Sequence, residues 1–344
     1  MEPEVEISEQ LRQPELPSRE KPSRWLGYLL LAVSILFVAF GLYRYQFRPA
    51  IDRSVPAHQA MPIDTPPLEL TSFQVRYGGE DLTPQCLKVS GDSLFVTFAG
   101  QSLLQIYSNK LDLLRNIQLE RPAIVQPTAF VLTDSLLLVA DTVLGTIAVY
   151  DRDGYYLNSA SWYPDHQTRL KPVHLAVAGG FLYATDIDRR NVAKISLTKH
   201  EPFYDFLELV DIVPKSTNTA IKLPTCAMSM PDGKLWIGDS DPGGLFIVDE
   251  TGSITTGESA PKTRMALPCD FAVSQLGDDS SSLRVHMLDR VAGKVFVYDI
   301  SGTLRLVYPR DRELHRPTAL AINRAERQIF VTESETREIT VFGY

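Results

Sequence analysis

Beyond residue 67, short runs of Val, Ile, Leu, Tyr and Phe are separated by Gly, Asp and Pro, and no convincing amphipathic helix is visible. Apolar runs between turn residues are typical of β-strands. The pattern also repeats, because six segments open with a proline and a short apolar strand at intervals of 43, 45, 52, 44 and 49 residues. A period of this length indicates a repeat architecture in an all-β domain. The opening prolines are Pro84, Pro127, Pro172, Pro224, Pro268 and Pro317.

Each opening segment leads to two further strands. The second strands read SLFVTF, LLLVAD, FLYATD, KLWIGD, RVHMLD and QIFVTE, and the third read LLQIY, TIAVY, NVAKI, GLFIVD, KVFVYD and EITVF. The turns DRDG (151–154), DETG (249–252) and DISG (299–302) stand where a third strand would form a hairpin with a fourth. Six such units predict a six-bladed β-propeller.

The units resemble the NHL repeat family, whose blades read roughly Pro-x-Gly/Ala-Ile-Ala-Val, then Val-Ala-Asp-Thr, then Arg-Ile-x-Val-Phe. The segment Leu182–Asp186 (LYATD) is also similar to the motif of YWTD propellers and departs from it only at Ala184. The resemblance covers about residues 68–344, and it implies a six-bladed propeller over that whole range.

The chain ends predict how the ring closes. The sixth unit stops at Tyr344, directly after its third strand, and so lacks an outer strand. Upstream of the first unit lies another strand-like run, LELTSFQVRY (68–77). If this run is the outer strand of the sixth blade, it closes the ring and removes an open sheet edge. The alternative, a strand that only leads into the first blade, leaves the sixth blade incomplete.

A membrane span precedes the repeats. From Trp25 to Tyr43 the chain has nineteen residues without a charge, bounded by Arg24 and Arg44. As a helix this segment would be about 28 Å long, close to the roughly 30 Å of the hydrocarbon layer. A buried soluble helix would show a polar stripe, and a signal peptide would have a shorter apolar stretch with an Ala-x-Ala-like cleavage site. We therefore expect a single uncleaved transmembrane helix.

The regions that flank this span differ in composition. Residues 1–24 are charged and free of aromatic residues, which predicts a disordered tail. Residues 44–67 hold several prolines and predict an extended stalk. Four Lys or Arg residues precede the span and three follow it within the next ten residues, so the positive-inside rule slightly favours a cytoplasmic N-terminus. The propeller, residues 68–344, is then expected in the periplasm or in an extracellular or lumenal space.

Composition narrows the classes of function. The net charge of −8 argues against nucleic-acid binding, which requires clustered Lys and Arg. The three cysteines, Cys86, Cys226 and Cys269, are too few for a disulfide-rich scaffold or a four-cysteine zinc site. In an oxidising compartment, however, Cys226 and Cys269 of adjacent blades could form a disulfide.

Acidic residues end five of the six second strands; the first blade has Phe98 there instead. An acid at such a turn usually accepts hydrogen bonds from backbone N–H groups two or three residues on. The alternative is an acidic rim that attracts cations or a basic partner. The five residues are Asp141, Asp186, Asp239, Asp289 and Glu333.

The positions two residues after the opening prolines are expected around the central channel. Four of the six hold possible ligands of a divalent metal such as zinc. The alternative is that these side chains are simply buried, as cysteines often are. The positions hold Cys86, Ala129, His174, Cys226, Asp270 and Ala319.

Enzymatic propellers supply a rival function, a metal-dependent hydrolase or lyase with its site in the channel. Amidating lyases carry zinc-binding histidines directly after the opening prolines, and gluconolactonase-like propellers hold a divalent metal with Glu, Asn and Asp. In the second class only Asp270 would qualify here. The histidine pattern of the first class is absent, since these positions hold Gln85, Thr128, Val173, Thr225, Cys269 and Thr318.

Two long connections flank the third blade, at residues 162–171 and 201–223, and both contain aromatic residues. Aromatic residues on free loops are typical of interface cores, although those in 201–223 could also belong to a half-buried outer strand. We therefore predict a membrane-anchored protein-binding scaffold without a cofactor, whose partner contacts one sector beside the third and fourth blades. The candidate contact residues are Trp162, Tyr163, His166, Phe203 and Tyr204.

Overall fold

The structure, a computed structural model of the chain, describes residues 65–119, 124–161, 163, 168–197, 208–213, 220–241, 243–249, 251–256, 265–275 and 282–344. The predicted tail (1–24), the predicted membrane helix (25–43) and residues 44–64 of the predicted stalk lie outside these residues. Within the described part, no helix is long and apolar enough to span a membrane.

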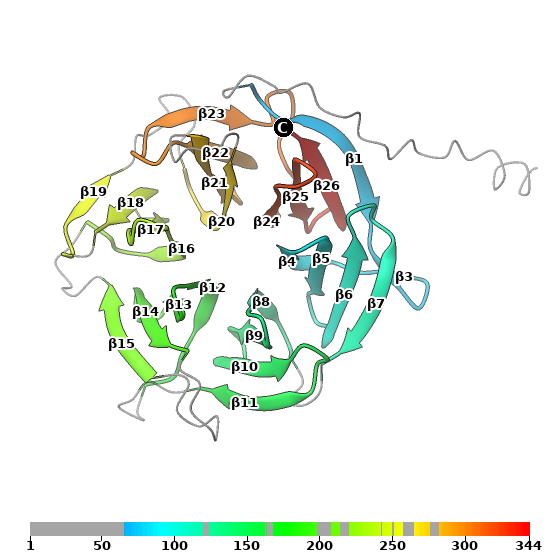
Figure 1. Cartoon of the computed structure of the whole chain (residues 1–344), viewed down its shortest axis with the longest axis horizontal. Helices are drawn as coiled ribbons and strands as arrows, with labels where there is room; N and C mark the ends of the chain where they lie inside the picture. Colours follow the sequence, from blue (N-terminus) through cyan, green and yellow to red (C-terminus); the bar gives the residue numbers. More distant parts are fainter. Residues whose placement is uncertain are drawn as a thin grey trace, which may run out of the picture. The chain divides into compact units, whose positions relative to one another are not determined.

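The described residues form six four-stranded antiparallel sheets around a common axis, which confirms the predicted propeller (Figure 1). Blade 1 comprises β4 (Pro84–Ser90), β5 (Ser93–Phe98), β6 (Leu103–Ser108) and β7 (Leu113–Gln118). Blade 2 comprises β8 (Pro127–Leu132), β9 (Leu136–Asp141), β10 (Thr146–Asp151) and β11 (Tyr156–Ala160). Blade 3 comprises β12 (Pro172–Ala178), β13 (Phe181–Asp186), β14 (Asn191–Ser196) and β15 (Glu208–Val213).

The second half of the ring repeats this arrangement. Blade 4 comprises β16 (Pro224–Ser229), β17 (Leu235–Asp239), β18 (Gly244–Val248) and β19 (Ile254–Thr256). Blade 5 comprises β20 (Pro268–Gln275), β21 (Leu283–Asp289), β22 (Lys294–Tyr298) and β23 (Leu304–Tyr308). Blade 6 comprises β24 (Pro317–Asn323), β25 (Gln328–Glu333), β26 (Glu338–Gly343) and β1 (Leu68–Gln74).

Every blade begins its inner strand at the opening proline. Each proline pairs with the last residue of the second strand, and the register shifts within the next three residues. Proline has no N–H to donate to the ladder, so the first strand position next to a bulge suits it. The inner strands begin at one face of the propeller, called here the start face, and they end at the opposite end face.

The N-terminal strand closes the ring, as the chain ends predict. β1 pairs antiparallel with β26, from Leu68 opposite Gly343 to Gln74 opposite Glu338. The strand is shorter than the predicted run of residues 68–77. The chain turns at Gly78 and Gly79, both with positive φ, and residues 76–77 form β2 (Arg76–Tyr77), which pairs with β3 (Glu80–Asp81) instead.

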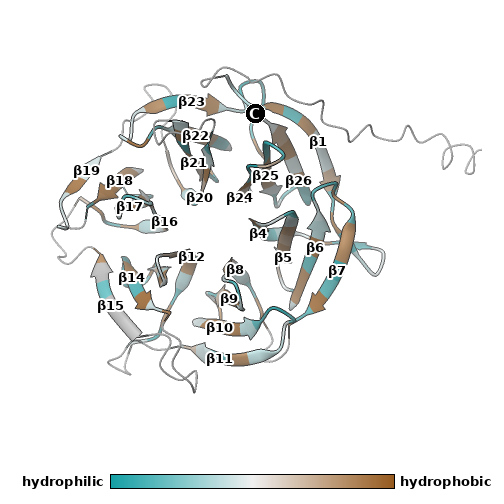
Figure 2. Cartoon of the chain, viewed as in Figure 1, coloured by the Kyte–Doolittle hydropathy of each residue, from teal (hydrophilic) through white to brown (hydrophobic). Residues whose placement is uncertain are grey.

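Apolar side chains fill the space between neighbouring blades. One cluster of buried residues joins blades 6, 1 and 2, and it includes Leu87, Phe130 and Phe330. Figure 2 shows hydrophobic stretches along the strands of every blade. Facing sheets of this kind derive their stability from apolar area removed from water.

Buried acids connect five of the six blades to the link that precedes each of them. Asp289 Oδ2 accepts hydrogen bonds from the N–H groups of Ala266 and Leu267, at 2.7 and 3.0 Å. Its Oδ1 accepts from Val291 and Ala292 in the following turn, at 2.9 and 2.8 Å. The same two-sided contact is made by Asp141, Asp186 and Asp239. The structural interpretation of these acids is thereby confirmed, because they are buried rather than displayed on a rim.

Blade 6 uses a longer acid for the same purpose. Glu333 accepts the N–H of His315 at 2.6 Å and binds Arg312 through both carboxylate oxygens, at 2.8 and 3.1 Å. Arg312 also donates to Glu69 of β1 at 2.8 Å. The acid of the sixth blade is therefore tied to the closing strand.

We predict that removing β1 destabilises the propeller. A chain that lacks residues 1–74 loses the ladder to β26 and the packing of Phe73 on Tyr107, so the free energy of unfolding should fall by several kcal/mol. The measurement is urea denaturation, with a chain that lacks only residues 1–64 as the control. Equal midpoints for the two chains would show that closure does not depend on β1.

The hydrogen bonds between the acids and the preceding links predict a second effect on stability. Replacing Asp289 by Ala leaves four backbone N–H groups without their acceptor, so we expect a loss of about 3 kcal/mol or more in the free energy of unfolding. The exposed Asp134, in the turn between β8 and β9, is the control, and Asp134→Ala should change stability by less than about 0.5 kcal/mol. Similar losses in both variants would contradict this role.

Candidate functional site

The side chains two residues after the opening prolines differ from blade to blade. Blades 1, 3 and 5 carry Cys86, His174 and Asp270, whereas blades 2, 4 and 6 carry Ala129, Cys226 and Ala319. All six are buried. Only two of the four predicted metal ligands come together, because His174 Nε2 lies 2.9 Å from Asp270 Oδ1.

The polar members of this series bind the neighbouring blade. His174 Nδ1 accepts the N–H of Ala227 at 3.4 Å, and Asp270 Oδ2 accepts that of Leu320 at 2.9 Å. Each donor is the third residue from the proline of the next blade. Because Nδ1 is an acceptor, the proton of a neutral His174 lies on Nε2 and is donated to Asp270.

Asp270 is the centre of an axial cluster that consists of Lys88, His174 and Asp270. Lys88 Nζ lies 3.1 Å from Oδ1 and 3.3 Å from Oδ2, and the N–H of Phe271 donates to Oδ1 at 2.8 Å. With His174 and Leu320, the carboxylate therefore accepts from four different groups. Through these hydrogen bonds the cluster joins blades 1, 3, 4, 5 and 6 across the axis.

Sequence reasoning missed Lys88. It stands four residues after an opening proline, where the other five blades hold an apolar residue, and that contrast was the available signal. The equivalent residues are Val131, Ala176, Met228, Ala272 and Ala321. A charge at one of six equivalent inner-strand positions needs a partner, and Asp270 supplies it from 182 residues away.

Electrostatics hold this cluster in one charge state. Burial opposes the ionisation of Asp270, but the Lys88 ammonium and the hydrogen bond from His174 outweigh it and lower the pKa of Asp270 to about 2. Burial likewise disfavours the charged form of Lys88, yet Asp270 raises the pKa of that ammonium above its ordinary value. At neutral pH the pair is therefore an anion and a cation whose charges cancel.

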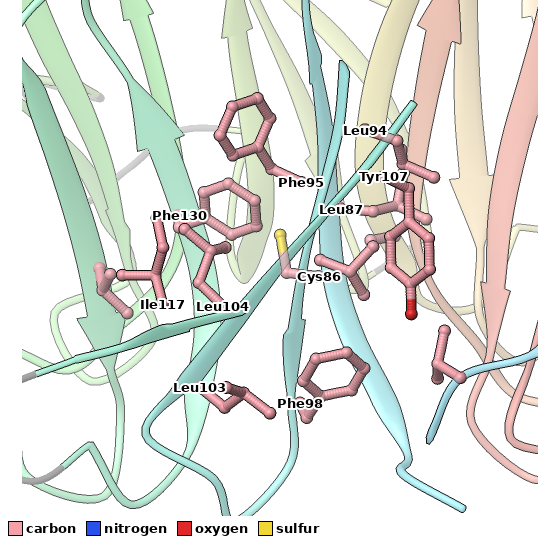
Figure 3. Close-up of a cluster of buried hydrophobic side chains, with 14 of the residues drawn as sticks. Cys86, Leu87, Leu94, Phe95, Phe98, Leu103, Leu104, Tyr107, Ile117 and Phe130 are labelled. Atoms are coloured by element: carbon pink, nitrogen blue, oxygen red, sulfur yellow. The ribbon is translucent and has the colours of Figure 1, made fainter. Parts of the chain in front are cut away.

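The cysteines are buried thiols. Burial raises the pKa of Cys86 to about 11 and the pKa values of Cys226 and Cys269 well above their ordinary value. Figure 3 shows Cys86 among apolar side chains of blades 1 and 2, including Phe95, Leu104 and Phe130. At neutral pH these groups are not thiolates, the form that binds metals.

The possible disulfide between Cys226 and Cys269 is not present, since all three cysteines are free. Cys226 stands two residues after its proline and Cys269 one residue after, and successive side chains of a strand point to opposite faces. Cys269 Sγ lies 3.8 Å from the carbonyl oxygen of Pro317 in blade 6, whereas Cys226 is fully buried in blade 4.

The axial residues do not fit a metal ion. In the described part of the chain, no group of three or more His, Cys, Asp or Glu side chains has the arrangement to hold one. Both nitrogens of His174 are engaged, and an ammonium lies against both oxygens of Asp270. A cation at Asp270 would have to displace Lys88.

The predicted partner-binding residues lie mostly outside the described residues: Trp162, His166, Phe203 and Tyr204. Tyr163 is described, and it is 3% exposed. Its hydroxyl lies 3.1 Å from Asp186 Oδ2 and 3.2 Å from Asn191 Oδ1, and Arg189 covers its ring. Tyr163 thus packs into the core beside blade 3.

The two long connections leave their strands at different faces of the propeller. Ala160 pairs with Ile147, near the start of β10, so the first connection leaves blade 2 at the start face. Ser196 pairs with both Phe181 and Glu208, so residues 197–207 connect β14 to β15 at the end face. These positions differ from the expectation that both aromatic segments share one surface.

A groove of about 590 Å³ lies between blades 3 and 4. Lys194 Nζ lies over the ring of Phe181 at 4.3 Å from its centroid, and Tyr183 lines the same wall. Blade 4 contributes Met230, Leu235 and other residues near its end-face turns. The groove thus combines apolar side chains and two acids, Asp211 and Asp249, with a cation held against aromatic rings.

A second buried polar network lies in blade 5. His286 lies 2.8 Å from Ser274 Oγ and 3.0 Å from Tyr308 Oη, and all three side chains are buried. Burial, and to a lesser degree the charge of Arg284, lowers the pKa of His286 to about 3. His286 is therefore neutral in the folded protein.

This shift predicts acid sensitivity. Between pH 6.5 and 3 the unfolded chain binds a proton at His286 that the folded chain does not. The contribution of neutral His286 to the free energy of unfolding is therefore fully present above pH 6.5 and is lost as the pH is lowered. We expect a loss of about 2 kcal/mol between pH 6.5 and 4.5, measured by urea denaturation at each pH. His286→Gln should show a smaller loss over the same interval, and an equal loss would exclude His286 as the cause.

Comparisons with known proteins show the fold. No protein-family model matches the sequence, and no curated protein matches it. A streptogramin B lyase structure is 13% identical, covering 80% of this chain and 87% of that chain with a TM-score of 0.54. Virginiamycin B lyase from Staphylococcus aureus is 13% identical, covering 80% and 99% with a TM-score of 0.55.

A third similar structure is the hydrazine synthase of Kuenenia stuttgartiensis, which is 11% identical and covers 77% of this chain and 97% of that chain with a TM-score of 0.52. Identities this low show the architecture alone, so membership of the NHL repeat family stays a prediction. The chain is a six-bladed β-propeller.

Proposed function

We propose that the protein is a membrane-tethered propeller, exported from the cytoplasm, that serves as a protein-binding scaffold. The uncharged segment Trp25–Tyr43 supports the tether, and the proline-rich residues 44–67 support a spacer between the membrane and blade 6. The observation that carries the scaffold function is the axial cluster, in which both carboxylate oxygens of Asp270 and both ring nitrogens of His174 are engaged by protein groups.

A closed axial cluster suits a structural frame better than a catalytic centre. A general base needs a free lone pair within reach of the substrate, and a catalytic metal needs an open coordination position. Asp270 accepts hydrogen bonds at both oxygens, and His174 is 5% exposed with both nitrogens engaged. These side chains hold the inner strands together.

The groove between blades 3 and 4 is the proposed partner surface. The rings of Phe181 and Tyr183 favour apolar side chains of a partner, and Lys194 together with the two acids of the lining favours polar groups beside them. The connection between β14 and β15, which contains the predicted contact residues Phe203 and Tyr204, starts and ends at the same face as the groove.

The alternative is a propeller hydrolase or lyase with a site in the channel. The similar structures favour it, because two are lyases and another is a catalytically inactive His-to-Ala variant of virginiamycin B lyase with quinupristin. One fold hosts many functions, however, so the comparison must be made at the site. The axial histidine of this chain, His174, is bound on both sides by protein groups.

Site-specific photo-crosslinking in intact cells tests the scaffold function. A photoreactive phenylalanine analogue in place of Pro231, an exposed residue of the groove, should give a discrete crosslinked species that mass spectrometry identifies. The same analogue in place of Asp134, in the corresponding turn of blade 2, should not. Lys194→Glu should reduce the crosslink about tenfold or more, as expected for an interface anchor.

Two controls separate the alternatives. Lys110→Glu, an exposed change in blade 1, should leave the crosslink unchanged. Metal analysis of the same purified full-length protein tests the enzyme. No groove-specific crosslink, together with about one metal ion per chain that is lost in Asp270→Asn, would reject the scaffold in favour of the metal-dependent enzyme.

A further inference from the structure

We infer that the end-face mouth of the central channel is a binding site for a small molecule with a carboxylate group and an apolar body, and that Lys88 binds its carboxylate. This inference goes beyond the proposed scaffold function and does not depend on the groove between blades 3 and 4. It rests on a cavity, on the hydrogen bonds of Lys88 and on the chemistry of the walls.

The cavity lies where the inner strands of blades 1 to 5 approach the end face. Its volume is about 250 Å³, near the lower end of the roughly 300–1,000 Å³ typical of small-molecule sites, so it suits a small ligand. Lys88 to Ser90, Val131 and Leu132 line one side, and His174 to Val177 and Met228 line the other.

The walls are apolar apart from a few groups. Val89, Leu132, Val177, Met228 and Phe271 contribute aliphatic and aromatic surface. Predominantly apolar walls with a small number of placed polar groups are the usual composition of a ligand site. An apolar body therefore gains from leaving water here, and the position of the polar group decides how it is oriented.

Lys88 is the charged group that the cavity exposes. Its side chain is 22% exposed, whereas that of Asp270 is 2% exposed and does not line the cavity. An ammonium has three N–H donors, and among the described residues the hydrogen bonds of Lys88 go to the single carboxylate of Asp270. Donor capacity therefore remains on the side that faces the cavity.

These observations select the class of ligand. A cation would meet the Lys88 ammonium and be repelled, whereas a neutral alcohol would accept only an ordinary hydrogen bond. A carboxylate accepts a charge-assisted bond, which is about twice as strong. Because Asp270 lies behind Lys88, the ligand completes a carboxylate–ammonium–carboxylate arrangement, and His174 stays bound to Asp270.

Isothermal titration calorimetry of the full-length protein in lipid nanodiscs tests the inference, with empty nanodiscs as the blank. Benzoate and hexanoate are the probes, and benzyl alcohol and benzylamine are the matched neutral and cationic compounds. We expect saturable binding of a carboxylate below about 10 mM, with binding of its alcohol and amine counterparts at least tenfold weaker. Lys88→Met should weaken carboxylate binding about tenfold or more.

Two further variants keep the test decisive if Lys88→Met fails to fold. Ala176→Leu extends a side chain into the cavity and leaves Lys88 and Asp270 intact, so it should weaken binding to a similar extent. Lys234→Met removes a 42% exposed lysine that is paired with Asp232, and it should leave binding unchanged. Absence of saturable binding, equal binding of the three compound classes, or wild-type affinity in Ala176→Leu would each overturn the inference.

Discussion

The propeller depends on the two-sided hydrogen bonding of the acids that end its second strands. In Asp289 one oxygen accepts two N–H groups of the incoming link, and the other accepts two from the following turn. A buried carboxylate is expensive to desolvate, and a fourfold set of backbone donors offsets that penalty without a cation. The contact recurs in blades 2 to 5 and Glu333 adapts it in blade 6, so five of the six blades hold the preceding link through an acid.

The buried carboxylate at the axis is also compensated by its donors, but two of these donors are side chains instead of backbone N–H groups. Asp270 is stable as an anion because Lys88 and His174 reach it from two other blades. Breaking a buried pair of this kind leaves an uncompensated charge, which is strongly destabilising. The cluster therefore fixes the distance between inner strands, and it leaves the end-face mouth of the channel as the open part of the axis.

Proteins that share an architecture need not catalyse the same reaction. The lyases that this chain resembles in fold share 13% of its residues in the aligned part, so their chemistry must reside in side chains that the fold does not specify. Here the polar side chains near the axis are bound to one another, and the groove between blades 3 and 4 carries the lysine held over aromatic rings. The proposed binding at the end face rests on this arrangement.

The sequence by itself determined the local repeat. Proline marks the start of each inner strand because it lacks an N–H, and alternating apolar runs mark the strands that follow, so both the six blades and the closing strand could be predicted. The acids were correctly assigned a structural role because some of their donors belong to the turn that follows directly in the chain, although the donors of the preceding link lie 15 to 23 residues upstream.

Only the tertiary structure decided the contacts across the ring. Lys88 and Asp270 are 182 residues apart in the chain, and no local pattern pairs them. The burial of Tyr163 and the faces at which the long connections begin were also beyond the sequence, because a connection of irregular length carries no period from which its direction can be read. Local periodicity specifies strands, whereas closure of the ring decides which side chains meet at its axis.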